Sequence, residues 1–214
     1  MIRTLALLSA ARVLFAQVPA TPPPAAPVLS AEPSPEQRAE RSALKAGQTA
    51  PDFTLPGVDG KPAKLSVFLK KGPVVLTFYR GGWCPYCNAQ LKSYQDALPA
   101  IQGAGATLVA VSPQLPDRSV MVAARHELAF PVLSDVGNKV AKSFGLTFVL
   151  EGEMASRYAF LADYNGAGPL ELPLPATYVI GRDGKILFAF VQADYKQRLA
   201  AADLVKALEA TKAR

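Results

Sequence analysis

The chain has 214 residues, of which 50% are hydrophobic and 19% are charged, a balance typical of a globular protein. Its net charge of +6 is thinly spread: residues 1–46 hold five Lys or Arg and three Glu, a net +2, which leaves +4 for residues 47–214. Lys70 and Lys71 form the longest basic run in that part and no aromatic stripe accompanies them, which argues against a nucleic-acid-binding protein.

The N-terminus resembles a secretory signal peptide over residues 1–20. Arg3 precedes a mostly apolar stretch, and Ala16 and Ala20 offer cleavage points. Residues 21–46 then combine a proline-rich linker with a short polar helix over residues 35–45. We therefore predict an exported protein, periplasmic or secreted, without stable membrane insertion after processing; a cytoplasmic protein with an unstructured leader is the alternative.

Residues 47–214 are predicted to form one domain, which opens with two short extended pieces, 50–55 and 59–65, joined by a turn. An apolar, β-branched run over residues 73–79 has the length of a strand. A helical periodicity begins at Cys84, and Pro99 is expected to end or kink it.

The middle of the domain continues the alternation of strands and helices. Residues 106–111 are a continuous apolar run, as expected of a strand buried on both faces. We expect Asp117 or Ser119 to cap the next helix, and Asp135 and Asn138 to cap the one after it. The sequence places these helices at residues 117–128 and 137–144, with a short extended piece at 130–133 between them.

The last part of the domain begins with residues 145–174, a polar insertion with a predicted helix around residues 154–161. Two strands, 177–180 and 186–191, flank a turn and form a predicted hairpin, and a helix over 200–211 closes the chain. The order β–α–β–α followed by β–β–α predicts an α/β thioredoxin-like fold, a central mixed β-sheet flanked by helices.

The two cysteines, Cys84 and Cys87, lie three positions apart between a predicted strand and helix. A helix N-terminus stabilises a thiolate and lowers its pKa below the usual value of about 8.5. Cys84 is thus the predicted reactive thiol and Cys87 the resolving one. A structural zinc needs about four ligands, and His126 is the only histidine; a structural disulfide here would close too short a loop to restrain the unfolded chain. We predict a redox-active pair with neither metal nor cofactor.

Several segments, in the same order, resemble the alkyl hydroperoxide reductase/thiol-specific antioxidant (peroxiredoxin) family of the thioredoxin superfamily, and residues 79–87 are similar to its peroxiredoxin-like branch. The other similar segments are residues 47–55, 59–61, 111–113, 130–135 and 175–180. The resemblance implies a thiol-dependent peroxidase that reduces hydrogen peroxide or organic hydroperoxides and is regenerated by thioredoxin or another thiol reductant. Arg80, four residues before Cys84, is a candidate for lowering the thiolate pKa and holding a peroxide oxygen; an arginine exposed at a strand end is the alternative.

Two departures from the family keep a second function open. Gly81 stands where the family carries a hydroxyl residue, and Pro175 stands where it carries an arginine. Pro175 instead occupies the place of the cis-proline that thioredoxins pack against their dithiol, so it is a candidate site residue for a thiol–disulfide oxidoreductase acting on protein disulfides. A binding module with an idle disulfide is the third alternative.

Other residues carry weaker expectations. Trp83 is expected either to cover the thiols as a platform for partners or simply to pack. The branch also has an Asp-Tyr segment before the last helix, here Asp194 and Tyr195 with Arg198 beyond, which either approaches the site or forms a structural ion pair. His126 is expected on the surface.

Overall fold

The structure is a computed structural model that describes residues 32–212. The chain divides into two units, Met1–Glu32 and Pro33–Arg214, and every described helix and strand belongs to the second. The predicted signal peptide at residues 1–20, and the linker up to residue 31, lie outside the described residues.

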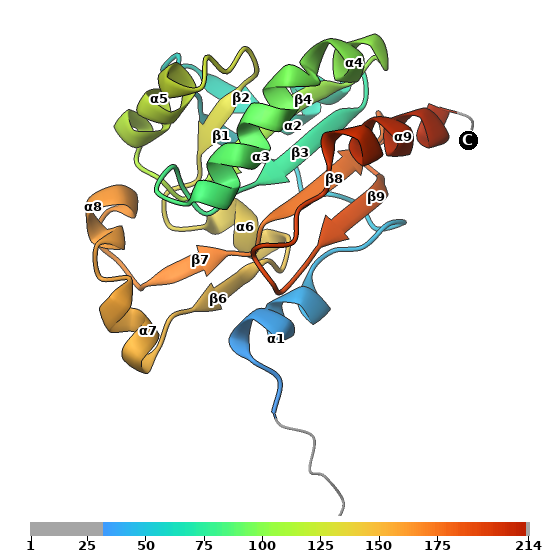
Figure 1. The fold of residues 1–214 in the computed structure, drawn as a ribbon. Coiled ribbons are helices and arrows are strands. Elements are labelled where there is room, and N and C mark those ends of the chain that lie inside the picture. The colour runs from blue at the N-terminus through green and yellow to red at the C-terminus, as the bar shows by residue number, and fades with distance from the viewer. Residues whose placement is uncertain (1–31, 213–214) are drawn as a thin grey trace, which may run out of the picture. The chain divides into compact units, whose positions relative to one another are not determined.

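A five-stranded sheet in the order β5-β4-β3-β8-β9 forms the centre of the second unit (Figure 1). The central strand β3 pairs parallel with β4 and antiparallel with β8, so the sheet is mixed, as predicted. The strands are β3 (Val74–Phe78), β4 (Thr107–Ser112), β5 (Val132–Ser134), β8 (Ala176–Ile180) and β9 (Ile186–Val191).

Both faces of β3 are buried, which explains its unbroken apolar sequence. Because successive side chains of a strand point to opposite faces, Val75 belongs to one core while Val74 and Leu76 belong to the other. The core on the Val75 side contains the two cysteines. Its helices are α3 (Pro85–Asp96), α4 (Leu98–Gly103), α5 (Pro116–Arg125) and α9 (Ala201–Lys212).

The opposite face of the sheet carries a second hydrophobic core, which includes Ala39, Leu65 and Phe144. Two small antiparallel hairpins, β1 with β2 and β6 with β7, complete the unit. The elements on this side are α1 (Pro35–Ser42), β1 (Thr54–Pro56), β2 (Pro62–Lys64), α2 (Leu65–Leu69), α6 (Lys139–Ser143), β6 (Thr147–Val149) and β7 (Glu171–Pro173).

The segment between β6 and β7 is the part that the sequence described least well. A single helix was predicted around residues 154–161, whereas the structure has two short ones, α7 (Gly152–Arg157) and α8 (Leu161–Asn165). Helix α2 was not predicted at all. Pro99 does break the helical pattern, because α3 ends at Asp96 and α4 begins two residues later.

The predicted helix caps are partly wrong. Helix α5 begins at Pro116 and no side chain caps it; Ser119 is buried instead, with its hydroxyl 2.8 Å from that of Ser134. Asp135 caps α6 as predicted, since its carboxylate accepts hydrogen bonds from the backbone N–H groups of Val140 and Ala141. Asn138 precedes α6, but its side-chain amide donates to the carbonyl of Glu171.

Candidate active site

The two thiols lie at the junction of β3 and α3, as predicted. Cys84 has extended backbone angles and is the N-cap of α3, and Pro85 occupies the first helical turn. The carbonyl of Cys84 accepts hydrogen bonds from the N–H groups of Cys87 and Asn88, both at 3.1 Å. The side chain of Cys84 is 1% exposed and that of Cys87 is 0% exposed, so both sulfurs are covered by protein.

The surroundings separate the two thiols electrostatically. A hydrogen bond from the Cys87 thiol is the largest cause that lowers the pKa of Cys84, to about 6; burial opposes it, while the Cys87 N–H and the charges of Arg80 and Arg198 assist it. Burial, and then the adjacent Cys84, raise the pKa of Cys87 well above its usual value. At neutral pH the pair therefore holds one thiolate, on Cys84, and one thiol.

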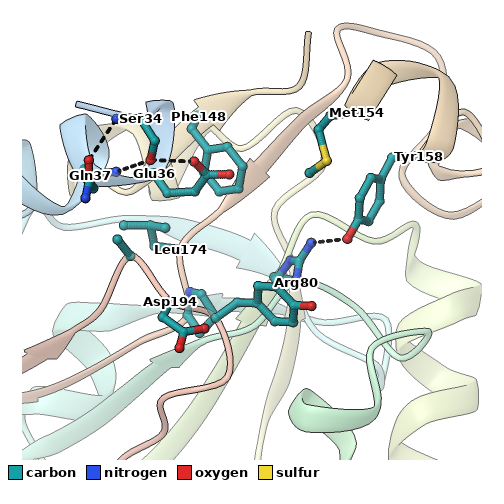
Figure 2. A pocket seen from close by; sticks show the side chains of 12 residues that line it. Ser34, Glu36, Gln37, Arg80, Phe148, Met154, Tyr158, Leu174 and Asp194 are labelled. Atoms are coloured by element: carbon teal, nitrogen blue, oxygen red, sulfur yellow. Dashed lines mark hydrogen bonds between the residues drawn. The ribbon is translucent and has the colours of Figure 1, made fainter. Parts of the chain in front are cut away.

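Arg80 is buried beside this pair, at 3% exposure, so the alternative of an exposed arginine is wrong. Its guanidinium carbon lies 4.4 Å from the ring centroid of Tyr195, 5.0 Å from that of Trp83 and 5.4 Å from that of Tyr158. One of its terminal nitrogens donates to the hydroxyl of Tyr158 at 2.9 Å (Figure 2), and its Nε has no acceptor. The three rings hold the cation by cation–π attraction without neutralising it.

The rings around Arg80 belong to a larger aromatic cluster. Trp83 makes edge-to-face contacts with Tyr158 and Phe160, at centroid distances of 5.6 and 5.4 Å, and Phe160 contacts Tyr164. These partners come from the segment of α7 and α8, which therefore covers the site. Of the two roles expected for Trp83, a platform for partners or simple packing, these contacts support packing.

A cavity of about 260 Å³ opens next to Arg80. Figure 2 shows residues of α1 and Phe148 on one side of it, Met154 of α7 and Tyr158, which follows α7, across from them, and Arg80 with Asp194 beneath. Its lining combines the buried Arg80 and apolar side chains with the polar residues of α1 and the carboxylate of Asp194. The lining residues are Ser34, Glu36, Gln37, Arg80, Phe148, Met154, Tyr158, Leu174, Pro175, Ala193, Asp194 and Tyr195.

A model of the AhpC/TSA family matches residues 46–189, more than half of the chain. The chain belongs to the AhpC/TSA family. Among curated relatives, it is similar to the chloroplastic peroxiredoxin Q of Sedum lineare, 37% identical over 120 residues, which are 56% of this chain and 64% of that protein. The chloroplastic peroxiredoxin Q of Triticum aestivum is 34% identical over 139 residues, 63% of this chain and 64% of that protein. The matched region thus spans less than two thirds of these relatives.

Solved structures of the family show the same architecture. The peroxidoxin BcpB of Mycobacterium tuberculosis superimposes with a TM-score of 0.63 at 29% identity, covering 79% of this chain and 97% of that chain. Peroxiredoxin Q of Xanthomonas campestris gives a TM-score of 0.59 at 21% identity, covering 74% and 90%. The predicted thioredoxin-like fold is confirmed.

Gly81, the first departure from the family pattern, has a structural reason in this member. Its φ of +145° is a conformation that side chains rarely adopt. A Cβ built there would lie 2.8 Å from Cδ1 of Trp83 and closer still to its Nε1. The indole ring therefore occupies the space of the hydroxyl side chain that the family carries, and Gly81 and Trp83 depend on each other.

The expected cis-proline is wrong. Pro175 has a trans peptide bond, as do all described residues. Pro175 lies with Leu174 in the short connection between β7 and β8. The N–H of Leu174 donates to the carbonyl of Leu146 at 2.8 Å, which extends the pairing next to β6 up to this proline. Pro175 lines the cavity beside Arg80.

The loop before α9, residues 192–200, reaches the site, as one of our two expectations stated. Tyr195 stacks against Arg80, and a terminal nitrogen of Arg198 lies 3.5 Å from the sulfur of Cys87. Asp194 forms no ion pair among the described residues; its carboxylate accepts the N–H of Lys196 at 3.0 Å and shapes the turn. Tyr158 was not predicted as a site residue, because it lies in the polar insertion of residues 145–174, whose sequence pattern indicates little regular structure.

The rest of the described chain offers no competing centre. His126 is the C-cap of α5 and is half-buried, where the sequence predicted a surface position. Within residues 32–212 no group of three or more His, Cys, Asp or Glu is arranged to hold a metal ion. Over the same residues, no helix has both the length and the hydrophobicity to cross a membrane.

Proposed function

We propose that this chain is a thiol-dependent peroxidase that reduces hydrogen peroxide or organic hydroperoxides. Cys84 is the attacking sulfur, Cys87 resolves it, and a thioredoxin-like or other thiol reductant regenerates the pair. One arrangement carries the proposal: Cys84 is the N-cap of α3, next to Cys87 and the buried Arg80. A hydrogen bond from Cys87 lowers the pKa of Cys84 to about 6, while burial keeps Cys87 protonated. Membership of the AhpC/TSA family and relatives named peroxiredoxin Q support it.

The first step consumes the peroxide. The Cys84 thiolate attacks one peroxide oxygen, an S–O bond forms, the O–O bond breaks, and the departing alkoxide or hydroxide takes a proton from solvent. Cys84 becomes a sulfenic acid. Arg80 is proposed to stabilise the charge that develops on the departing oxygen, since its buried Nε lacks an acceptor and preorganised donors lower such barriers.

The second step forms the disulfide. The sulfur of Cys87 attacks the sulfenic sulfur of Cys84; an S–S bond forms, the S–O bond breaks, and the departing hydroxide takes the Cys87 proton and leaves as water. An external dithiol then reduces the disulfide and is itself oxidised. Because both sulfurs are at most 1% exposed, the peroxide is proposed to enter through the cavity beside Arg80 and Pro175.

One assay tests the proposal against thiol–disulfide exchange. Reduced protein is mixed in a single turnover with hydrogen peroxide, with an organic hydroperoxide, or with a protein disulfide, and oxidation is followed by quenched intact mass. A peroxidase reacts faster with a peroxide than with the disulfide at equal concentration. The reverse order would assign the protein to disulfide exchange.

The organisation of the precursor is also a proposal. Residues 1–20 are proposed as an export signal, residues 21–46 as a linker with a short helix, and residues 47–214 as the catalytic domain. N-terminal sequencing of protein from a periplasmic or secreted fraction tests this, and an intact Met1 on cytoplasmic protein would contradict it. The two peroxiredoxin Q relatives from Sedum lineare and Triticum aestivum are described as chloroplastic proteins.

A further inference from the structure

Arg198 is a cation placed against the resolving sulfur. One terminal nitrogen lies 3.5 Å from the sulfur of Cys87, while its Nε and its other terminal nitrogen are buried without an acceptor. Among the described residues, no carboxylate forms an ion pair with it. Leaving N–H groups of a charged side chain unpaired is costly, so a feature of this kind needs an explanation.

A buried polar network fixes the backbone next to Arg198. The hydroxyl of Tyr94 in α3 donates to the carbonyl of Leu199 at 3.2 Å. The same hydroxyl lies 3.1 Å from the hydroxyl of Thr177 in β8 and accepts the amide of Gln90 at 3.1 Å. These hydrogen bonds connect the loop to α3, which carries Cys87, and to β8 of the central sheet. The backbone next to Arg198 is therefore fixed relative to the sulfur of Cys87.

We propose that Arg198 is a catalytic residue of the resolving step, in which it stabilises the developing Cys87 thiolate as that sulfur attacks the sulfenic sulfur of Cys84. The inference rests on the proposed peroxidase function and assigns a second arginine to it. Arg80 stabilises the charge on the departing peroxide oxygen, whereas Arg198 stabilises the charge on the sulfur of Cys87, which forms the disulfide.

The first step of the reaction removes the negative charge of Cys84 but not the positive charge of Arg198, which favours ionisation of Cys87 in the second step. In the reduced protein burial raises the pKa of Cys87, and the neighbouring Cys84 thiolate raises it further and draws its proton into a hydrogen bond. Oxidation converts Cys84 to a neutral sulfenic acid, which removes that repulsion and leaves Arg198 in place.

The other titratable groups at Cys87 do not compensate for a lost Arg198. Burial raises the pKa of Tyr79 to about 12 and also raises that of Tyr94, so both phenols stay neutral. Arg80 contributes a backbone hydrogen bond to Cys87, but its guanidinium is held among three rings. Arg198 is thus the cation at hydrogen-bond distance when Cys87 must lose its proton.

The test separates the two chemical steps in time. Reduced Arg198→Met protein is mixed with one equivalent of peroxide at pH 8, where Cys84 is ionised with or without Arg198. Fluorescence of Trp83, the only tryptophan, and dimedone trapping with intact mass follow sulfenic acid formation and loss. We expect formation to change less than about threefold and disulfide closure to slow about tenfold or more.

Matched variants keep the result interpretable. Arg198→Lys retains the charge and is expected to recover part of the closure rate, Arg198→Gln serves if the Met variant folds poorly, and Lys196→Met removes an exposed charge from the same loop. Closure at the wild-type rate in the Met or Gln variant would overturn the proposal. So would equal slowing of both steps, which indicates a structural role.

A second measurement does not depend on peroxide chemistry. In a Cys84→Ser background, the pH dependence of Cys87 alkylation is measured with and without Arg198→Met. We expect loss of the arginine to shift the alkylation profile of Cys87 to higher pH. An unshifted profile contradicts the role of Arg198. A shifted profile, combined with wild-type protein that forms no Cys84 sulfenic acid when mixed with peroxide, would instead contradict the peroxidase proposal and leave the contact between Arg198 and Cys87 standing.

Discussion

The dithiol lies between two parts of the molecule that are stabilised differently: the junction of β3 and α3, and the two segments that cover this junction. The junction of β3 and α3 is tied by backbone hydrogen bonds and by full burial in the core, and it carries both sulfurs. Two covers, residues 152–165 and the loop 192–200, come from far along the chain and meet it through ring contacts and single hydrogen bonds. The junction determines which atoms react, while the covers supply or hold the charges that act on them.

This difference ranks the expected effects of substitution. A change in the junction removes a reacting atom or strains a backbone that the core holds fixed. A change in a cover removes one interaction among several, and each is worth about 1 kcal/mol. Large losses are therefore expected from the junction and graded ones from the covers.

The largest effect is expected at the sulfurs themselves. Cys84→Ser should abolish peroxide turnover, because the hydroxyl is not ionised at neutral pH. Cys87→Ser should still react once and then stop as a sulfenic acid or a mixed disulfide. Intact mass and non-reducing gels measure both. Wild-type protein should oxidise to a monomeric Cys84-to-Cys87 disulfide, and mainly disulfide-linked dimers would contradict internal resolution.

The second effect concerns the shape of the junction. Gly81→Thr restores the family's hydroxyl residue, but we expect it to impair the protein, since it combines an unfavourable φ with a contact against Trp83. The backbone alone should cost about 1–3 kcal/mol of unfolding free energy. Denaturant unfolding and single-turnover oxidation measure the two consequences.

A matched pair of variants separates the causes. Gly81→Ala in a Trp83→Ala background keeps the backbone cost but removes the contact, so it should destabilise less than Gly81→Ala alone. Gly103→Ala, at the last residue of α4 with open space around it, serves as the control and should be neutral or stabilise the fold by up to about 1 kcal/mol. Improved peroxide reactivity in Gly81→Thr would show that our account of the missing hydroxyl is wrong.

The same contrast explains how far the sequence could be interpreted. Strand β3, the N-cap at Cys84 and the hairpin of β8 and β9 follow from local periodicity and turn residues, and these were predicted. The contacts of Arg80 with Tyr158 and of Arg198 with Cys87 span 78 and 111 positions, and no local pattern encodes them. The cis-proline failed because it was transferred from thioredoxins on position alone.

The pH dependence of Cys84 gives the third effect. With a pKa of about 6, the thiolate is fully formed at pH 7–8, and its fraction falls about tenfold from there to pH 5. Peroxide oxidation should therefore lose about a factor of ten over that range. Since the Cys87 hydrogen bond is the largest cause of the lowered pKa, Cys87→Ala should move the acid limb to higher pH. A limb near pH 8–9 in wild type would contradict the assignment of Cys84.

Arg80 gives the fourth effect and tests the charge that the covers hold. Arg80→Met keeps the unbranched stem of the side chain but removes the guanidinium cation, so peroxide oxidation should slow about tenfold, by about 1.4 kcal/mol. Arg125→Met, which removes an exposed charge from α5, is the control. Rates measured at pH 8 avoid a contribution from the Cys84 pKa. Equal rates in the two variants would rule out a role for Arg80 in O–O cleavage.

Tyr158→Phe should have the smallest effect, because it removes one hydrogen bond and leaves the rings. The variant keeps the edge-to-face contact with Trp83 and the ring beside Arg80, but the guanidinium loses its 2.9 Å partner. A single hydrogen bond contributes about 0.5–1.5 kcal/mol, and Arg80 retains three aromatic neighbours, so we expect peroxide oxidation to slow about threefold. Tyr158→Ala removes the ring as well and should fall closer to Arg80→Met. If Tyr158→Phe were as slow as Arg80→Met, the cover would act through this one hydrogen bond, and the graded contrast between junction and covers would not hold.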